Sequence, residues 1–377
     1  MRGAADVQVS VPFLDLRPVH EPIATELLAE FASLIESNAY TNGPAVAEFE
    51  REFASYCRAV DCVGLASGLD ALRLALLAGG IERGDEVIVP ANTFVATVEA
   101  VTQAGGVPVL VDVTERDYNV DVAAVEAAVG PRTRYLLPVH LYGQLADVRA
   151  LAEVAASARV GVVEDACQAH GASRDGYVSG ELAGAAAFSF YPGKNLGAMG
   201  DAGALVTNDA ALAARARMLR EHGQSRKYVH AVEGWTARLD TIQAIVLRRK
   251  LTLLDEWTEQ RRAAARFYDD ALAGVGDLVL PPVPDGSEPV WHLYVVRTAH
   301  PADLAEALAA RGIGTGRHYP EPIHLTGAYA SRDHTRGTFP VAERLAGEVL
   351  SLPIYPGITE QQLEAVADGV RAYFGGV

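Results

Sequence analysis

Two reactive side chains, a lysine and an aspartate, each follow an apolar run of the chain. Lys194 lies in the glycine-rich turn Pro192-Gly-Lys-Asn-Leu-Gly197. A lysine held among apolar and small residues has a destabilised ammonium, so its amine can form a Schiff base with an aldehyde. Asp165 ends the run Val162-Val-Glu-Asp165, where a carboxylate can keep a nearby ring nitrogen protonated. A solvated loop lysine and a helix-capping acid explain the same residues equally simply, so both interpretations stay open on these segments alone.

A second group of residues could hold a flat, phosphorylated ligand. Ser67 and Gly68 precede a helix expected to run to about residue 78, where backbone N–H groups and the positive helix end can bind phosphate. Phe94 follows an expected strand and could lie against a planar ring. Gln168 and His170 follow Asp165 closely enough to line the same cavity. An ordinary N-cap and an ordinary core phenylalanine remain the alternatives for the first two segments.

The turn around Lys194 is not a nucleotide-binding P-loop. That motif, G-x-x-x-x-G-K-[ST], requires glycine at position 188 and serine or threonine at position 195. The chain has Phe188 and Asn195 instead. The P-loop alternative therefore fails at two positions.

The elements that must position these residues are short apolar runs alternating with Ala-rich stretches. The alternation predicts a mostly parallel sheet with helices on both faces, and ligands of such sheets gather beyond the carboxyl ends of the strands. Two helices, at residues 239–257 and 259–273, then lead to a smaller α+β part, and we place the domain boundary between residues 1–250 and 251–377. The expected strands are residues 87–90, 107–113, 135–140, 161–165, 186–191 and 204–207; the later elements are a loop at 281–289, a strand at 290–296, a helix at 302–310 and a helix at 359–373 capped by Thr359.

Composition limits the classes of partner. The 377 residues are 50% hydrophobic, enough for a large core. With 48 acidic against 32 basic residues, the net charge of -16 would repel a nucleic-acid backbone. Three cysteines without a C-x-x-C pair indicate neither a disulfide framework nor a metal site. Residues 1–10 lack a signal-peptide pattern and no apolar run is long enough to cross a membrane, so a cytoplasmic enzyme is expected.

The spacing of Ser67, Phe94, Asp165, Gln168 and Lys194 resembles the DegT/DnrJ/StrS family of sugar aminotransferases, which have the aspartate aminotransferase fold, fold type I. The likeness extends over nearly the whole chain. It includes the segments Val11-Pro-Phe-Leu-Asp-Leu16, Thr41-Asn-Gly-Pro44, Pro138-Val-His-Leu-Tyr-Gly143, Gly234-Trp-Thr-Ala-Arg-Leu-Asp-Thr-Ile-Gln-Ala244 and His318-Tyr-Pro320. The resemblance implies a three-layer αβα large domain with a smaller C-terminal α+β domain.

The resemblance also implies pyridoxal 5'-phosphate (PLP) as cofactor. The implied roles are Lys194 as the Schiff-base lysine, Asp165 at the pyridine nitrogen, Gln168 near the ring hydroxyl, Phe94 stacked on the ring, and Ser67, the Gly68 and Leu69 amides, and Ser189 at the phosphate. The sequence departs from the family pattern at two positions. Leu69 stands where threonine is usual, and Thr236 stands where asparagine commonly reaches the neighbouring subunit's cofactor phosphate. We therefore expect weaker cofactor retention.

The form of the lysine turn is most similar to the branch that aminates 3-keto sugars, while branches acting on 4-keto sugars usually have a different turn. By resemblance the amino donor is L-glutamate and the acceptor is a keto-6-deoxyhexose linked to a pyrimidine diphosphate, most closely a dTDP-3-keto sugar. A homodimer with shared active sites is expected, with residues 237–243 contacting the neighbour. Candidates for the substrate pocket, each of which could equally be a surface residue, are Arg226, Lys227, Tyr228, His230, Arg317, His318, Tyr319 and His324.

Two further functions fit the sequence less well. A PLP-dependent sugar dehydratase of the same fold has histidine at the lysine position, so Lys194 opposes it. A regulator without turnover would bring a nucleic-acid-binding segment, but neither a basic stripe nor a helix-turn-helix pattern precedes Val11. Aminotransfer is the favoured interpretation.

Overall fold

The computed structural model describes residues 9–330 and 334–375. Its centre is a seven-stranded sheet in the order β1-β9-β8-β5-β4-β2-β3. The strands are β1 (Asp61–Leu65), β2 (Glu86–Pro90), β3 (Val107–Val111), β4 (Thr133–Leu136), β5 (Gly161–Asp165), β8 (Ala185–Ser189) and β9 (Gly203–Thr207). Within this sheet β9 runs antiparallel to both of its neighbours, while the other strands are parallel to one another. The predicted α/β fold with a mostly parallel sheet is confirmed.

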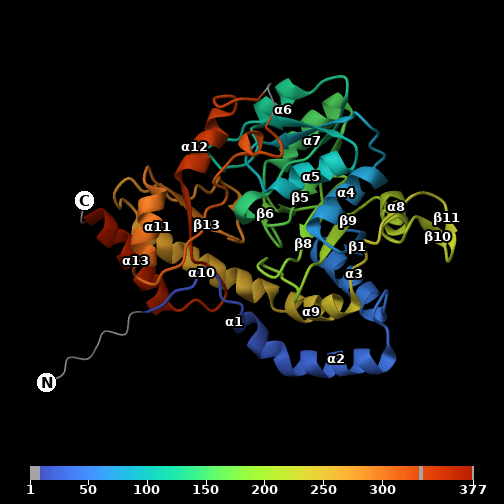
Figure 1. Cartoon of the computed structure of the whole chain (residues 1–377), viewed down its shortest axis with the longest axis horizontal. Helices are drawn as coiled ribbons and strands as arrows, with labels where there is room; N and C mark the ends of the chain where they lie inside the picture. Colours follow the sequence, from blue (N-terminus) through green and yellow to red (C-terminus); the bar gives the residue numbers. More distant parts are fainter. Residues whose placement is uncertain (1–8, 331–333, 376–377) are drawn as a thin grey trace.

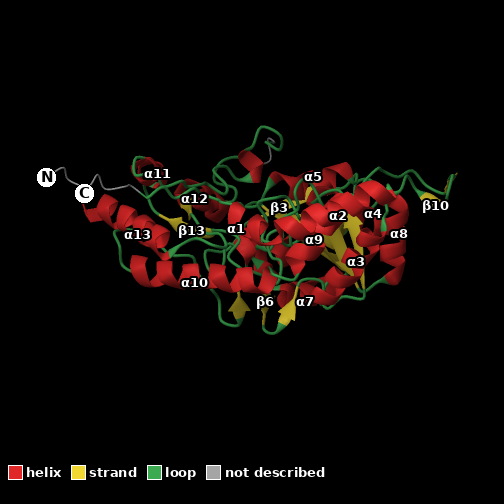
Figure 2. Ribbon diagram, turned by 90° about the horizontal axis from the view of Figure 1, so that it is seen from below, coloured by secondary structure: helices red, strands yellow, loops and turns green. Residues whose placement is uncertain are grey.

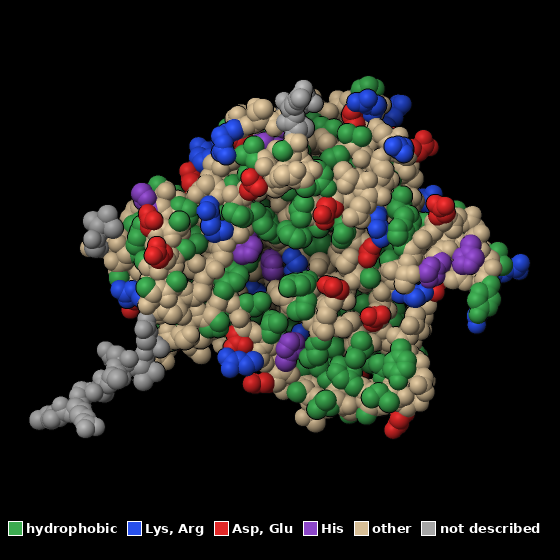
Figure 3. Space-filling view, viewed as in Figure 1, with side chains coloured by type: hydrophobic (Ala, Val, Ile, Leu, Met, Phe, Trp, Pro, Cys, Tyr) green, Lys and Arg blue, Asp and Glu red, His purple; other side chains and the backbone are tan. Residues whose placement is uncertain are grey.

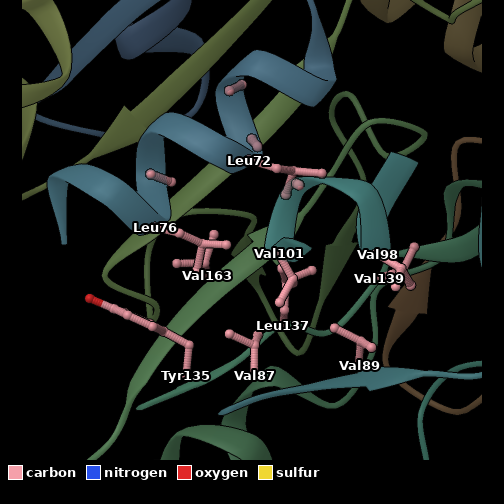
Figure 4. Packing of buried hydrophobic residues seen from close by; sticks show 14 of the residues in the cluster. Leu72, Leu76, Val87, Val89, Val98, Val101, Tyr135, Leu137, Val139 and Val163 are labelled. Carbon is pink, nitrogen blue, oxygen red and sulfur yellow. The ribbon is translucent and has the colours of Figure 1, made fainter. Parts of the chain in front are cut away.

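Helices cover both faces of the sheet, because its strands carry apolar side chains on both sides. Val87 and Val89 of β2 pack in the core beneath α4 and α5, and Ile88 points to the opposite core. Figure 4 shows the first of these cores, with Leu72 and Leu76 above the strands. One layer contains α4 (Gly68–Ala78), α5 (Val95–Gln103) and α8 (Ala210–Arg220), and the other contains α3 (Pro44–Tyr56), α6 (Val122–Ala128), α7 (Val148–Ala158) and α9 (Thr241–Leu251).

Most predicted strands form, but several end earlier than expected. The runs at 107–113, 135–140 and 186–191 contain β3, β4 and β8, which end at residues 111, 136 and 189. The apolar residues beyond these ends continue into segments that pack near the carboxyl edge of the sheet. The strand β1 was not among those predicted; its five residues include Gly64 next to its end.

The N-terminal segment and the two helices after the sheet lie along the lower side of the molecule in Figure 1. The predicted helix break at residue 258 is wrong, because α9 ends at Leu251 and α10 begins at Leu254. The break has no glycine or proline signal; Thr252 bonds its hydroxyl back to the Arg249 carbonyl, and Leu254 and Trp257 are then buried. Besides α9, the elements along this lower side are α1 (Arg17–His20), η1 (Glu21–Ile23), α2 (Ala24–Ser37) and α10 (Leu254–Leu272).

The C-terminal part forms a smaller group of elements beside the sheet, seen at the left of Figure 2. It consists of the antiparallel pair β13 (Tyr294–Arg297) and β14 (Val349–Leu352) with α11 (Pro301–Ala309), α12 (Pro340–Glu348) and α13 (Glu360–Gly375), and it shares a core with α10. The predicted cap is present, since Thr359 Oγ1 accepts from the Gln362 amide at 3.2 Å. The predicted strand at 290–296 begins only at Tyr294. The division at residue 250 stays a prediction.

Short elements complete the chain. These are β6 (Ser173–Arg174), β7 (Tyr177–Val178) and β12 (Ser287–Glu288) in one small sheet, the hairpin of β10 (Gln224–Arg226) and β11 (Val229–His230), and the 3-10 turns η2 (Leu141–Gly143) and η3 (Ile323–Leu325). The hairpin projects from the body of the molecule at the right of Figure 1. None of the helices in the described residues is both long and apolar enough to span a bilayer. Residues 1–8, on which the prediction about the N-terminus partly depends, lie outside the described residues.

Candidate active site

A cavity of about 640 Å³ opens at the carboxyl ends of the parallel strands, the edge that the topology predicts. The turns after β1, β2, β5 and β8 each contribute side chains to it, and the C-terminal part closes it from the other side. Its lining includes Ser67, Gly68, Leu69, Phe94, Asp165, Gln168, Ser189, Lys194, Arg261, His292, His318 and Tyr319. The structure therefore brings eight of the nine predicted cofactor residues together.

Lys194 lies in a tight turn after β8, held by a hydrogen bond from its backbone N–H to the Tyr191 carbonyl at 2.8 Å. Gly197 is required for this turn, because a Cβ there would approach the Pro192 oxygen to 2.3 Å. Burial lowers the pKa of the Lys194 ammonium, while Cys167 and Asp165 act in the opposite direction. Since the neutral amine is the nucleophile, this environment makes Lys194 more reactive than a surface lysine.

Asp165 ends β5 with its carboxylate almost fully buried and firmly oriented. One oxygen accepts from Thr97 Oγ1 at 2.7 Å and the other from the Cys167 amide at 3.1 Å. Thr97 is itself 2.8 Å from Thr93 Oγ1. Each carboxylate oxygen has a second lone pair, so Asp165 can still accept from a ligand in the cavity.

The start of α4 forms a cradle suited to an anion. Ser67 caps the helix by accepting from the Asp70 amide at 3.0 Å. The amides of Gly68 and Leu69 lie in the first turn of the helix, where backbone N–H groups have no intrahelical acceptor. A Cβ at Gly68 would come within 2.7 Å of Cys167 Sγ and of Ser189 Cβ, so this backbone can approach its neighbours only as glycine. The donors and the helix dipole together fit a phosphate group.

Phe94 and Gln168 have the orientations that a flat ring between them would need. Phe94 is 51% exposed, although it is apolar, and its surface faces the cavity next to Tyr319, with ring centroids 5.6 Å apart. Gln168 accepts from the Tyr142 amide at 2.7 Å and donates to the Tyr319 hydroxyl at 3.1 Å, which fixes its side chain. The lysine, the acid, the anion cradle and the aromatic wall thus fit PLP.

Other predicted residues lie away from this cavity. Thr236 is exposed and 3.1 Å from His222 Nε2, and the described lining does not include it. The four candidates Arg226, Lys227, Tyr228 and His230 are exposed on the projecting hairpin. Within one chain, these five residues do not meet the lysine.

The candidates of the later segment divide into two pairs. His318 and Tyr319 line the cavity, and His318 is oriented by a contact of its Nδ1 with Ser351 Oγ at 2.8 Å. Arg317 instead donates to backbone carbonyls near the end of α12, and His324 is buried against Glu343 at 2.9 Å. In this chain the last two residues stabilise the C-terminal part.

Several side chains of the site were missed from the sequence, among them Thr97, Arg261 and His292. Thr97 orients Asp165 and lies one helical turn after the Phe94 position, a spacing that could have signalled it. Arg261 and His292 reach the cavity from α10 and from the segment before β13. Both are distant in sequence from the lysine turn, and no local pattern marks them.

Buried histidines near Lys194 make stability sensitive to acid. Burial, reinforced by the Lys194 charge, lowers the pKa of His170 to about 3, although the Ser189 backbone acts in the opposite direction; the same two causes lower that of His318 to about 4. Since the unfolded pKa is about 6.5, the unfolded chain binds more protons below that pH. We expect the free energy of unfolding of the cofactor-free protein to fall from pH 6.5 toward pH 4, by up to about 1.4 kcal/mol per pH unit for each histidine.

Urea denaturation at several pH values measures this effect. Carboxylates also titrate in this range, so His170→Gln is the informative comparison, because it removes one histidine and leaves the carboxylates unchanged. Its curve should be less steep than that of the parent protein between pH 6 and pH 4. Parallel curves would show that His170 does not contribute.

The sheet topology and the lysine–aspartate pair at its carboxyl edge define the class of protein, a PLP-dependent transferase of fold type I. Comparison with known proteins identifies the family. The model of the DegT/DnrJ/EryC1/StrS aminotransferase family matches residues 21–371, so the chain belongs to this family. The predictions of the family, the cofactor and the aminotransferase class are confirmed.

Individual relatives are similar over nearly their full length. A dTDP-3-amino-3,4,6-trideoxy-alpha-D-glucose transaminase of Streptomyces venezuelae is 48% identical, covering 96% of each chain. The erythromycin biosynthesis sensory transduction protein EryC1 of Saccharopolyspora erythraea is 46% identical, covering 97% of this chain and 100% of the relative. The crystal structure of S. venezuelae DesV in complex with a ketimine intermediate superimposes with a TM-score of 0.95 at 48% identity, covering 98% of this chain and 99% of that chain.

Proposed function

We propose that this protein transfers an amino group from L-glutamate to carbon 3 of a dTDP-linked 3-keto-6-deoxyhexose. The observation that carries the proposal is the geometry around Lys194, an amine of lowered pKa in the same cavity as the oriented Asp165 carboxylate. Two observations support a dTDP-linked 3-keto sugar as the acceptor of the amino group. They are the Pro192-Gly-Lys-Asn-Leu-Gly197 turn and the relative that is named as a dTDP-3-amino sugar transaminase.

Different residues of the cavity bind the cofactor and transfer the proton. PLP, when bound, supplies an aldehyde for amine exchange and a ring that accepts electron density. Ser67, the amides of Gly68 and Leu69, and Ser189 would hold its phosphate, Phe94 would cover one face of the ring, and Gln168 would bind near the ring hydroxyl. Asp165 would keep the ring nitrogen protonated. The Lys194 amine would carry a proton from the α-carbon of the donor to the cofactor carbon that bears the amino group, and in the second half it would carry a proton from that carbon to carbon 3 of the sugar.

The test is incubation of the purified protein with PLP, glutamate and a panel of keto-sugar nucleotides. NMR of the products identifies the aminated carbon. Amination of 3-keto dTDP sugars supports the proposal, and selective amination of a 4-keto sugar replaces it with the alternative acceptor. Loss of a sugar hydroxyl without amination would identify a dehydratase. No turnover on any sugar would favour the sensory function that the name of one relative suggests.

We infer a cytoplasmic homodimer with shared active sites. Leu28, Ile35 and Tyr40 are apolar side chains exposed on α2 and the segment after it, at 69%, 65% and 48%. Figure 3 shows apolar side chains gathered over this lower part of the molecule. The projecting hairpin carries its basic and aromatic residues away from its own cavity, which supports the proposal that they contact the substrate of a second subunit. Size-exclusion chromatography with light scattering tests the dimer.

The exposed position of Thr236 leads to a prediction about cofactor retention. Asparagine at this position is longer and can donate to a phosphate of the neighbouring subunit's cofactor. We expect Thr236→Asn to lower the dissociation constant for PLP by roughly 3- to 10-fold, the effect of one added hydrogen bond. Dialysis followed by measurement of bound PLP checks the change, with Thr236→Val as the matched variant lacking a polar group. Equal affinities in all three proteins would contradict the role of position 236.

A further inference from the structure

Arg261 is a buried cation in the wall of the cavity without an acidic partner. It comes from the first half of α10 and is 3% exposed. Its Nη1 donates to the carbonyls of Trp291 at 3.1 Å, His292 at 3.4 Å and Ile354 at 2.9 Å. Its Nε is buried without a hydrogen-bond partner, and no carboxylate among the described residues forms an ion pair with it. Buried charges are normally paired, so an uncompensated one beside a ligand cavity indicates an anion site.

The electrostatic surroundings strengthen this indication. Burial lowers the pKa of Arg261 to about 9, which leaves the guanidinium charged at neutral pH. After burial, the basic neighbours Lys194, Arg261, His170 and His318 lower the pKa of His292; at neutral pH the two neighbouring histidines are neutral, and Arg261 keeps its charge. Figure 3 shows histidine and basic side chains together in the hollow at the centre of this face. This side of the cavity therefore attracts negative charge.

His292 gives the site a second polar group and connects it to the lysine turn. Its Nδ1 is 3.1 Å from Asn195 Oδ1, and Asn195 Nδ2 donates to the Val290 carbonyl at 2.8 Å. With its amide oriented in this way, Asn195 accepts from His292 Nδ1, so Nε2 of the neutral ring can accept a hydrogen bond from a ligand but cannot donate one to an anion. Asn195 directly follows Lys194 in the chain. An anion held by Arg261 would therefore share one cavity with the reactive amine.

The position of the site indicates which anionic group of the two substrates it binds. The diphosphate of a sugar nucleotide is separated from the reacting ketone by the sugar ring, whereas the α-carboxylate of an amino acid is one bond from the carbon that loses its proton. The phosphate of the cofactor has its own cradle at α4. Resting on the proposed function, we propose that Arg261 binds a carboxylate of the amino-acid donor.

The experiment isolates the donor half of the reaction. The PLP-loaded protein is mixed with glutamate alone, and the loss of the visible cofactor absorption gives the rate and the half-saturating glutamate concentration. Arg261→Met should raise that concentration about 10- to 100-fold, the effect of losing charge-assisted hydrogen bonds. The amine form mixed with keto sugar alone should retain its half-saturating sugar concentration. Arg262→Met is the matched control, because the adjacent Arg262 bonds to Glu259 and to backbone carbonyls outside the cavity.

A second readout does not depend on the reaction. Glutarate, a dicarboxylate without an amine, should raise the thermal midpoint of the cofactor-free parent protein and of Arg262→Met, but not that of Arg261→Met, relative to chloride of equal ionic strength. If the methionine variant does not fold, Arg261→Gln and Arg261→Lys replace it. Glutamine keeps a hydrogen-bond donor for the carbonyls but has no charge, whereas lysine keeps the charge. Arg261→Gln should therefore lose much more glutamate affinity than Arg261→Lys.

The outcomes separate this inference from the proposed function. An unchanged glutamate constant in folded Arg261→Met or Arg261→Gln overturns the carboxylate site while leaving aminotransfer intact. Absence of any glutamate-dependent change in the parent protein would instead refute glutamate as donor. A comparison with alanine as donor locates the contact further: an equal loss with both donors assigns Arg261 to the α-carboxylate, and a loss with glutamate alone assigns it to the side-chain carboxylate.

Discussion

Replacing Lys194 with alanine should lower kcat for amino transfer by at least about 10³-fold, because the variant lacks both the covalent anchor of the cofactor and the proton-transferring amine. The purified variant mixed with PLP should also lack the visible absorption that PLP acquires when it is joined to a lysine. Steady-state assays and absorption spectra measure the two effects separately.

Lys194→Arg is the matched variant for this prediction. Arginine keeps the positive charge and the length of the side chain, but its guanidinium cannot form the imine or act as a base at neutral pH. It should therefore be as inactive as the alanine variant. Added methylamine should restore part of the activity of Lys194→Ala, since a free amine can take over the proton transfer. Full activity in either variant would remove Lys194 from the mechanism.

Asp165→Asn should reduce kcat by roughly 10²- to 10⁴-fold with little loss of stability. Asparagine fills the same volume and can still accept the bond from Thr97, which is 2.7 Å from Asp165 in the protein. It has no negative charge, however, so the ring nitrogen of PLP loses its proton and the ring withdraws electrons less strongly.

Two measurements distinguish this role from a structural one. The bound cofactor in Asp165→Asn should show an altered absorption spectrum, whereas the thermal midpoint should stay close to that of the parent protein. Thr97→Val, which keeps the charge and removes one orienting bond, should cause a much smaller loss of about 3- to 10-fold. A Thr97→Val effect as large as that of Asp165→Asn would argue that orientation, and not charge, is what the site requires.

The sequence was informative where chemistry depends on local pattern. The lysine turn needs small residues around it, and Asp165 ends a buried strand, so both leave signals within ten residues of chain. The apolar runs predicted six strands of the central sheet because these strands are covered on both faces. The ends of the strands were less certain, since the apolar residues beyond them pack near the site.

What could not be predicted depends on contacts between distant segments. Arg261 is one of several arginines on a polar helix, and only its position against Trp291 and Ile354 makes it part of the cavity. The break between α9 and α10 is likewise set by burial of Leu254 and Trp257 rather than by a helix-breaking residue. The candidates on the hairpin were chosen for their chemistry, but their exposure away from the cavity became visible only in three dimensions.

The single reversed strand has a consequence for the order in which the protein assembles. β1 joins the sheet only through β9, pairing Asp61 with Thr207 and Leu65 with Gly203. The phosphate cradle begins just after β1, whereas the lysine turn connects β8 to β9. During synthesis on the ribosome, the cradle must therefore wait until residue 207 has emerged before it gains its place beside the lysine. A nascent chain shorter than this has no complete pocket, so the complete site for the cofactor forms only after β9 has joined β1 to the sheet.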